Sequence, residues 1–264
     1  MMDKVWAVVR KEWAEVFKNR FVLFTVSFLP LLFTVIPLIT LYTTGTSGEM
    51  GGVSLEDLPP GMSALCGGLD GVACAQYAII SQFFTLFMMV PVIIPITIAS
   101  YSIVGEKTTN TLEPLLATPI TTMELLAAKE LAAAIPAILA TWGSYLLYAI
   151  GARILAERPE VVAKMFDPFW LLAIFAVGPL LAIAGVCIAI MVSSRVNDPR
   201  VAEQISAIFV LPLIGLFIAQ TSGVILINEK IIMWMAAGLV VVDTGLLCFA
   251  TQLFQRETIL TRWK

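Results

Sequence analysis

The sequence predicts an all-α membrane protein, with six transmembrane helices preceded by an N-terminal amphipathic helix at the membrane interface. Its composition is 59% apolar and only 13% charged, whereas soluble domains have about 45–50% and about 25%. A helix needs roughly 20 mostly apolar residues to cross a bilayer, and six stretches qualify. They cover residues 21–42, 77–103, 129–155, 168–192, 202–227 and 231–254. We therefore treat residues 1–264 as a single transmembrane domain.

The distribution of Lys and Arg predicts that both termini lie in the cytoplasm of a cell whose plasma or inner membrane the chain crosses. Basic residues in short loops resist translocation and stay on the cytoplasmic side. Alternate loops and the two termini carry twelve of the sixteen basic residues, and the other loops carry four. Residues 43–76, which contain no Lys or Arg, are expected to form an external loop, and residues 104–128 a cytoplasmic one.

Residues 3–20 have the pattern of a helix lying along the membrane surface. Apolar side chains recur every three or four residues, and most of the basic side chains lie on another face. The residues expected to meet the interface are Trp6, Arg10, Lys11, Trp13 and Phe17. The alternative is a helix that simply extends the first span into the cytoplasm.

The predicted cytoplasmic loop contains two helix-start signals. Asn110 precedes Glu113 by three residues and Thr121 precedes Glu124 by three, so each pair can form a capping box. Pro119 separates the two predicted helices.

The first of these helices would carry a ridge of leucines. Leu112, Leu115 and Leu116 fall on one side of it. Such a ridge suits a groove on a partner protein, or it lies on lipid or on the protein's own bundle.

The same loop resembles the signature cytoplasmic loop of ABC type-2 exporter permeases. The resemblance rests on a spaced set of residues: Glu106, Thr111, Leu112, Glu113, Leu115, Leu116, Thr118, Pro119, Ile120, Glu124, Leu125 and Lys129. The N-terminal run from Arg10 to Trp13, followed by residues 18–20, is similar to the start of the same family. With the six spans, the resemblance covers most of the chain.

The resemblance implies a transport mechanism and two protein partners. In that family two permease subunits pair in the membrane, and each docks an ATPase subunit that binds ATP and Mg²⁺ and drives the change between inward-open and outward-open forms. The coupling residues implied here are Glu106, Asn110, Thr111, Leu112, Glu113, Leu115, Leu116, Thr118 and Pro119. The substrate path would run between the two copies, lined partly by the first, second and fifth spans.

Several function classes are excluded because the sequence lacks the residue types or motifs that they need. The sequence has no Gly-Lys pair and therefore no phosphate-binding G-x-x-x-x-G-K-[ST] loop. It has no His, which removes His-based zinc sites and catalytic triads. The net charge of −3 and the clustering of basic residues beside the spans argue against nucleic-acid binding. We expect no enzymatic activity, cofactor or metal in this chain.

A few polar residues fall within the predicted spans or the external loop. Asp243 lies near the middle of the sixth span, where a charge is costly; it either contacts a substrate or ion, or forms a buried hydrogen bond. Gln82 and Gln220 are explained by hydrogen bonds between helices. Cys66 and Cys74 either form a disulfide in the external loop or remain free thiols.

Three functions remain open at this point. The leading one is the permease subunit of an ABC exporter. An ion-coupled secondary transporter that uses Asp243 is the second, and a non-transporting membrane scaffold is the third.

Overall fold

A computed structural model describes residues 2–47, 71–109, 111, 120–156, 159–225 and 227–253. The described residues form helices and short connections, with no strand among them. Six helical stretches are long and apolar enough to cross a membrane: Arg20–Thr43, Ala73–Thr108, Thr122–Leu155, Pro168–Ser193, Pro199–Thr221 and Glu229–Leu253. The predicted fold class is confirmed.

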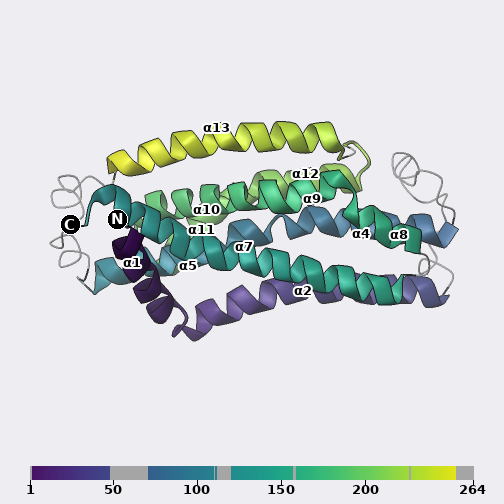
Figure 1. Cartoon of the computed structure of the whole chain (residues 1–264), viewed down its shortest axis with the longest axis horizontal. Coiled ribbons are helices and arrows are strands. Elements are labelled where there is room, and N and C mark those ends of the chain that lie inside the picture. Colours follow the sequence, from purple (N-terminus) through teal and green to yellow (C-terminus); the bar gives the residue numbers. More distant parts are fainter. Residues whose placement is uncertain are drawn as a thin grey trace.

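The spans run alternately up and down one elongated bundle (Figure 1). Their helices are α2 (Arg20–Ser47), α4 (Gly71–Phe87) with α5 (Val90–Thr108), α7 (Thr122–Leu155), α9 (Pro168–Leu172) with α10 (Gly178–Ser193), α11 (Pro199–Ser206) with α12 (Leu211–Thr221), and α13 (Glu229–Leu253). Short 3₁₀ segments at Lys164–Phe166 and Ala207–Val210, a π-helical segment at Ala173–Val177 and α8 (Pro159–Ala163) complete the described part.

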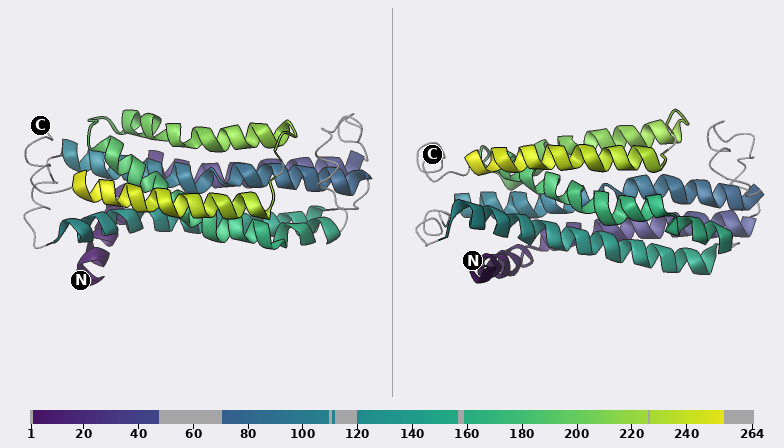
Figure 2. Two further views of the ribbon diagram at one scale, coloured as in Figure 1. Left: turned by 90° about the horizontal axis from the view of Figure 1, so that it is seen from above. Right: turned by 45° about the horizontal axis from the view of Figure 1, so that its top comes forward.

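The N-terminal helix α1 (Met2–Val16) lies across one end of the bundle, steeply inclined to the spans. It packs against α7 and α5. Figure 2 shows that α13 ends near this same end of the molecule. We call it the α1 end.

Three prolines mark places where a span changes its helical geometry. Pro91 follows a turn at Met88 and Met89 between α4 and α5, Pro179 follows the π-helical segment, and Pro212 follows the second 3₁₀ segment. Each proline lies in the first turn of the next helix, where its missing N–H removes no helical hydrogen bond.

The buried core runs along α5, which packs most extensively against α10 and α7. Near the other end of the bundle, aromatic rings of α4, α7 and α9 stack around Phe84, whose ring centroid lies 4.5 Å from that of Trp170. By contrast, α2, α12 and α13 expose many apolar side chains, among them Phe24, Ile218 and Val241. Such exposure is expected of helices that face lipid or a second protein.

Several span ends differ from the predicted ones, and two differ most. The fifth span ends at Thr221 rather than 227, because Gly223 adopts a left-handed φ of 72° and the Val224 N–H donates to the Ala219 carbonyl at 3.0 Å. This is the Schellman arrangement that terminates helices. The third span begins earlier, at Thr122 rather than 129, because the predicted capping box of Thr121 and Glu124 is present.

Candidate functional site

The residues on either side of the predicted coupling loop meet in a buried ion pair. Glu106 lies near the end of α5 and Lys129 lies two turns into α7. Glu106 Oε2 is 2.7 Å from Lys129 Nζ, and both side chains are almost completely buried. The pair therefore fastens the start of the loop to the helix that follows it.

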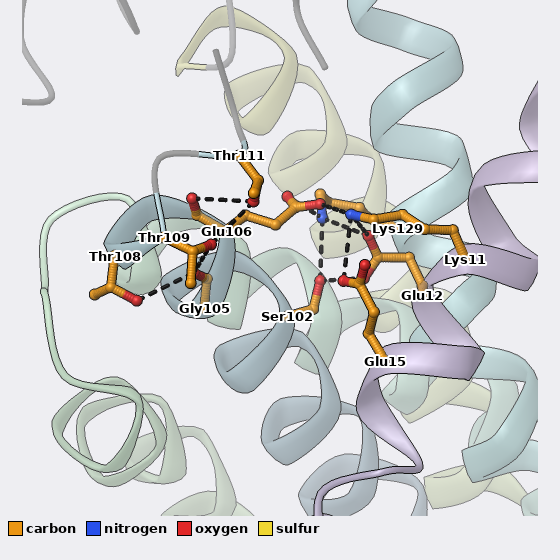
Figure 3. Close-up of polar contacts among 10 residues, drawn as sticks. All are labelled: Lys11, Glu12, Glu15, Ser102, Gly105, Glu106, Thr108, Thr109, Thr111 and Lys129. Atoms are coloured by element: carbon orange, nitrogen blue, oxygen red, sulfur yellow. Dashed lines mark hydrogen bonds and ion pairs between the residues drawn. The ribbon is translucent and has the colours of Figure 1, made fainter. Parts of the chain in front are cut away.

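The N-terminal helix α1 joins this pair from the other side (Figure 3). Glu12 Oε1 lies 3.1 Å from Lys129 Nζ, and Lys11 Nζ lies 2.5 Å from Glu106 Oε1. We call Lys11, Glu12, Glu106 and Lys129 the charge cluster. Its two positive and two negative charges link α1, α5 and α7 at one point.

Ser102 adds two hydrogen bonds at the base of the charge cluster. Its hydroxyl accepts a hydrogen bond from Lys129 Nζ at 3.0 Å and donates one to Glu12 Oε2. Nearby, the Trp13 indole N–H donates to the Ala132 carbonyl at 2.9 Å, a second tie between α1 and α7. Buried ionic groups are tolerated when they are paired and hydrogen-bonded in this way.

The electrostatics of the α1 residues reflect this pairing. Burial opposes ionisation of Glu12, but the positive charge of Lys129, the hydrogen bond from Ser102 and the charge of Lys11 outweigh burial and lower the pKa of Glu12 to about 2. Burial likewise disfavours the charged form of Lys11, yet the hydrogen bond and negative charge of Glu106 raise its pKa overall. Both groups are charged at neutral pH.

The predicted interfacial residues do not all face one environment. Trp13 and Phe17 are partly buried, whereas Trp6 and Arg10 are exposed, with the Arg10 guanidinium 5.9 Å from the centre of the Trp6 ring. Lys11, expected at the membrane surface, reaches the charge cluster.

Most of the predicted coupling residues lie outside the described part of the chain: Asn110, Leu112, Glu113, Leu115, Leu116, Thr118 and Pro119. Thr111 is described and exposed, and its N–H donates to the Glu106 carbonyl at 3.0 Å. A cavity of about 370 Å³ lies beside the charge cluster, lined on one side by Glu15 and Asn19 and on the other by Thr109 and Thr111. Thr109 and Thr111, the described residues at the start of the loop, therefore lie beside the charge cluster.

The intramembrane amides make contacts between helices, as the sequence predicts. Gln220 Nε2 donates to the Ser81 carbonyl at 3.2 Å and to Ser81 Oγ at 3.0 Å, while Gln220 Oε1 accepts from Thr85. Gln82 Nε2 donates to Thr221 Oγ1 at 2.9 Å. These bonds fasten α12 to α4.

The sequence left two alternatives open for Asp243 and two for Cys74. Asp243 is buried, and neither of its carboxylate oxygens has a hydrogen-bond partner among the described residues. Cys74 is disulfide-bonded, but Cys66 lies outside the described residues, so the pairing of these two cysteines stays a prediction.

Sequence reasoning missed three acidic residues. Glu12 was overlooked as a site residue although it falls between the apolar Val9 and Val16 on the buried side of α1. Glu203 accepts a hydrogen bond from Thr97 across α11 and α5. Glu130 sits beside Lys129 at the predicted start of a span, where an acid is easily taken for a surface residue. An acid within an apolar helical face was the available signal for Glu12 and Glu130, whereas Glu203 has the polar Arg200 and Ser206 three residues away.

The charge cluster is a set of ion pairs that joins three helices. No group of three or more His, Cys, Asp and Glu side chains in the described ranges is placed to hold a metal ion. A search of curated proteins finds no match to the chain. A comparison with protein families matches residues 6–240 to the ABC-2 family transporter protein. With six potential spans and a match over most of its length, the chain belongs to the ABC-2 family and is a multi-pass membrane permease of the ABC transporter class.

Proposed function

We propose that the chain is the membrane-spanning subunit of an ABC exporter, moving a substrate outward with ATP hydrolysed by a separate ATPase that docks on residues 106–120. The observation that supports this most directly is the charge cluster. It ties both ends of the proposed docking loop to α1.

The charge cluster gives the loop a way to move the membrane helices. Separating Glu106 from Lys129 would leave each of these buried charges with one partner instead of two, and breaking a buried pair completely costs about 3–5 kcal/mol. A displacement of the loop by an ATPase therefore carries the ends of α5 and α7 along with it. Through Glu12 and Lys11 it carries α1 as well.

The proposal places the α1 end of the bundle in the cytoplasm. The twelve basic residues assigned to that side support it. A second copy would pack against the exposed apolar faces of α2 and α12, as the exposure of Leu31 and Leu211 suggests. The substrate path would then run between the copies.

Co-purification with the ATPase encoded beside this chain tests the docking assignment. Leu112→Asp and Glu113→Ala are expected to reduce ATPase association, because they remove the apolar ridge and the capping residue of the predicted helix. Glu160→Ala, in α8 near the opposite end of the bundle, is the matched control and should leave association unchanged. Full ATPase association in both loop variants would contradict the proposal.

Energy use is tested separately in reconstituted vesicles. We expect transport to stop when the partner ATPase is made unable to hydrolyse ATP. Transport that continues at the same rate would instead favour the ion-coupled alternative.

A further inference from the structure

A second cavity, of about 420 Å³, lies between α7, α10 and α13 at the α1 end of the bundle. Its walls are mainly apolar, formed by side chains such as Met123 and Leu131 of α7, Ile190 of α10 and Leu247 of α13. The volume lies in the range of pockets that hold drug-sized ligands. It is separate from the charge cluster, which faces α1 and α5.

One carboxylate lines this apolar cavity. Glu130 lies next to Lys129 on α7, and consecutive helical residues point about 100° apart. Lys129 therefore joins the charge cluster while Glu130 faces α10 and the cavity. Glu130 Oε1 accepts a hydrogen bond from Cys187 Sγ at 3.0 Å, but Glu130 Oε2 is buried with no partner.

A second carboxylate lies near the first. Asp243 of α13 is only 5% exposed, and both of its oxygens are without partners in the described structure. It lies on α13, which packs against α10, the helix that carries Cys187. Neither acid forms a salt bridge with any described residue, in contrast to the paired acids of the charge cluster.

The apolar cavity therefore contains one carboxylate, Glu130, that forms no ion pair with a described residue, and it offers a place for a positive charge. Burying a carboxylate without a partner is costly, and a bound cation would remove much of that cost. A metal ion prefers several oxygen ligands at close range, and these walls supply few. An anionic lipid headgroup would be repelled.

We infer that this cavity binds a monovalent organic cation with an apolar body, its charge beside Glu130 and its apolar part against α7 and α13. This goes beyond the proposed function, because binding at equilibrium requires neither ATP nor the ATPase. The two proposals can therefore fail independently.

Two probes of nearly equal size and opposite charge test the inference. The full chain in nanodiscs of neutral lipid is titrated with tetraphenylphosphonium and, separately, with tetraphenylborate. Empty nanodiscs correct for partition into lipid. We expect saturable binding of the cation at one site per chain, and no saturable binding of the anion.

Three variants assign the binding to this cavity. Glu130→Gln keeps the side-chain shape and should weaken cation binding by about tenfold or more. Ala127→Trp, which fills the cavity from its exposed rim, should abolish binding without removing any charge. Glu203→Gln, an equivalent change at an acid outside the cavity, should leave binding unchanged.

The inference is overturned if the two probes bind alike, or if neither binds above partition. It is also overturned if both Glu130→Gln and Ala127→Trp bind the cation as tightly as the wild type does. Thermal unfolding of each variant confirms that the chain is folded, and the cavity-filling variant keeps the test decisive even if Glu130→Gln is unstable.

Discussion

Lys129 and Glu130 are neighbours on α7 with opposite surroundings. Lys129 is enclosed by two carboxylates and a hydroxyl, whereas Glu130 meets a thiol and an apolar cavity. A charge that is paired in this way stabilises the arrangement of its helices. A charge left without a partner in a cavity instead favours a ligand of opposite sign.

Removing one buried charge of the cluster should destabilise the attachment of α1. Glu12→Gln leaves Lys129 with one carboxylate instead of two, and we expect a loss of about 3 kcal/mol in the free energy of unfolding. Glu15→Gln makes the same chemical change on the same helix at a half-exposed position, 3.4 Å from Lys11, and should cost less than about 1 kcal/mol. Thermal unfolding of the two purified variants gives the comparison, and equal losses would contradict it.

The lowered pKa of Glu12 also predicts how stability depends on acidity. Its pKa falls from an ordinary 4.5 to about 2 in the folded chain, so the folded state binds fewer protons than the unfolded state between these values. The stability that Glu12 contributes is complete above about pH 4.5 and is lost as the pH falls toward 2. Melting temperatures measured across this range should decline less in Glu12→Gln than in the wild type. Parallel declines would show that other groups carry the effect.

The charge cluster was only partly predictable. The resemblance to ABC-2 permeases pointed to Glu106, Lys129 and Lys11 individually, because each falls in a recognisable pattern. That they meet depends on how α1 crosses α5 and α7, and the spacing of residues within one helix contains no such information. Glu130 lines a cavity for the same reason, because α10 packs against both α7 and α13.

At the scale of elements, the close approach of α5 and α10 holds the centre of the bundle together. A side chain at Gly185 would place its Cβ 3.1 Å from the Val92 carbonyl oxygen and 3.5 Å from Pro95 Cγ and Ile96 Cγ1. Contacts between backbones this close depend on small residues, as is common between membrane helices.

Gly185→Val should therefore push α10 away from α5. We expect a loss of about 1–3 kcal/mol in stability from overpacking, measured as a lower melting temperature in detergent. Gly143→Val is the matched control, because a Cβ at Gly143 meets no atom within 4 Å. The prediction fails if the two substitutions lower the melting temperature equally.

Helix boundaries could be predicted where the capping residues were recognised in the sequence. The capping box at Thr121 was identified in the sequence, and α7 begins directly after it. With 34 residues, α7 is about 51 Å long, longer than the hydrocarbon core of about 30 Å, so part of it extends beyond the membrane. A hydropathy scan locates the apolar part of such a helix and misses its polar first turns.

At the scale of the whole molecule, the six-span architecture was predictable because a bilayer sets the length of each apolar stretch. The position of the second span inside the bundle could not be predicted, because α4 and α5 are as apolar as the helices with exposed apolar faces. Only packing distinguishes a buried apolar helix from an exposed one. The exposed faces of α2, α12 and α13 thus emerge from the structure rather than from hydropathy.

These buried and exposed helices suggest how movement would pass through the molecule. The charge cluster lies where α1, α5 and α7 meet, so the docking loop and α1 should move as one rigid unit. Spin labels on Ala7→Cys, exposed on α1, and Thr111→Cys, exposed at the start of the loop, report the distance between the two. Cys187→Ala and Cys248→Ala remove the free thiols among the described residues.

The decisive measurement is the distance between these two spin labels, determined by pulsed electron paramagnetic resonance in the complex with the ATPase. It is measured once without nucleotide and once with the complex trapped by ATP and vanadate. Rigid linkage predicts one narrow distance distribution, the same in both nucleotide states, which broadens when Glu106→Gln is added. A wild-type distance that changes between the two nucleotide states would contradict rigid linkage through the charge cluster.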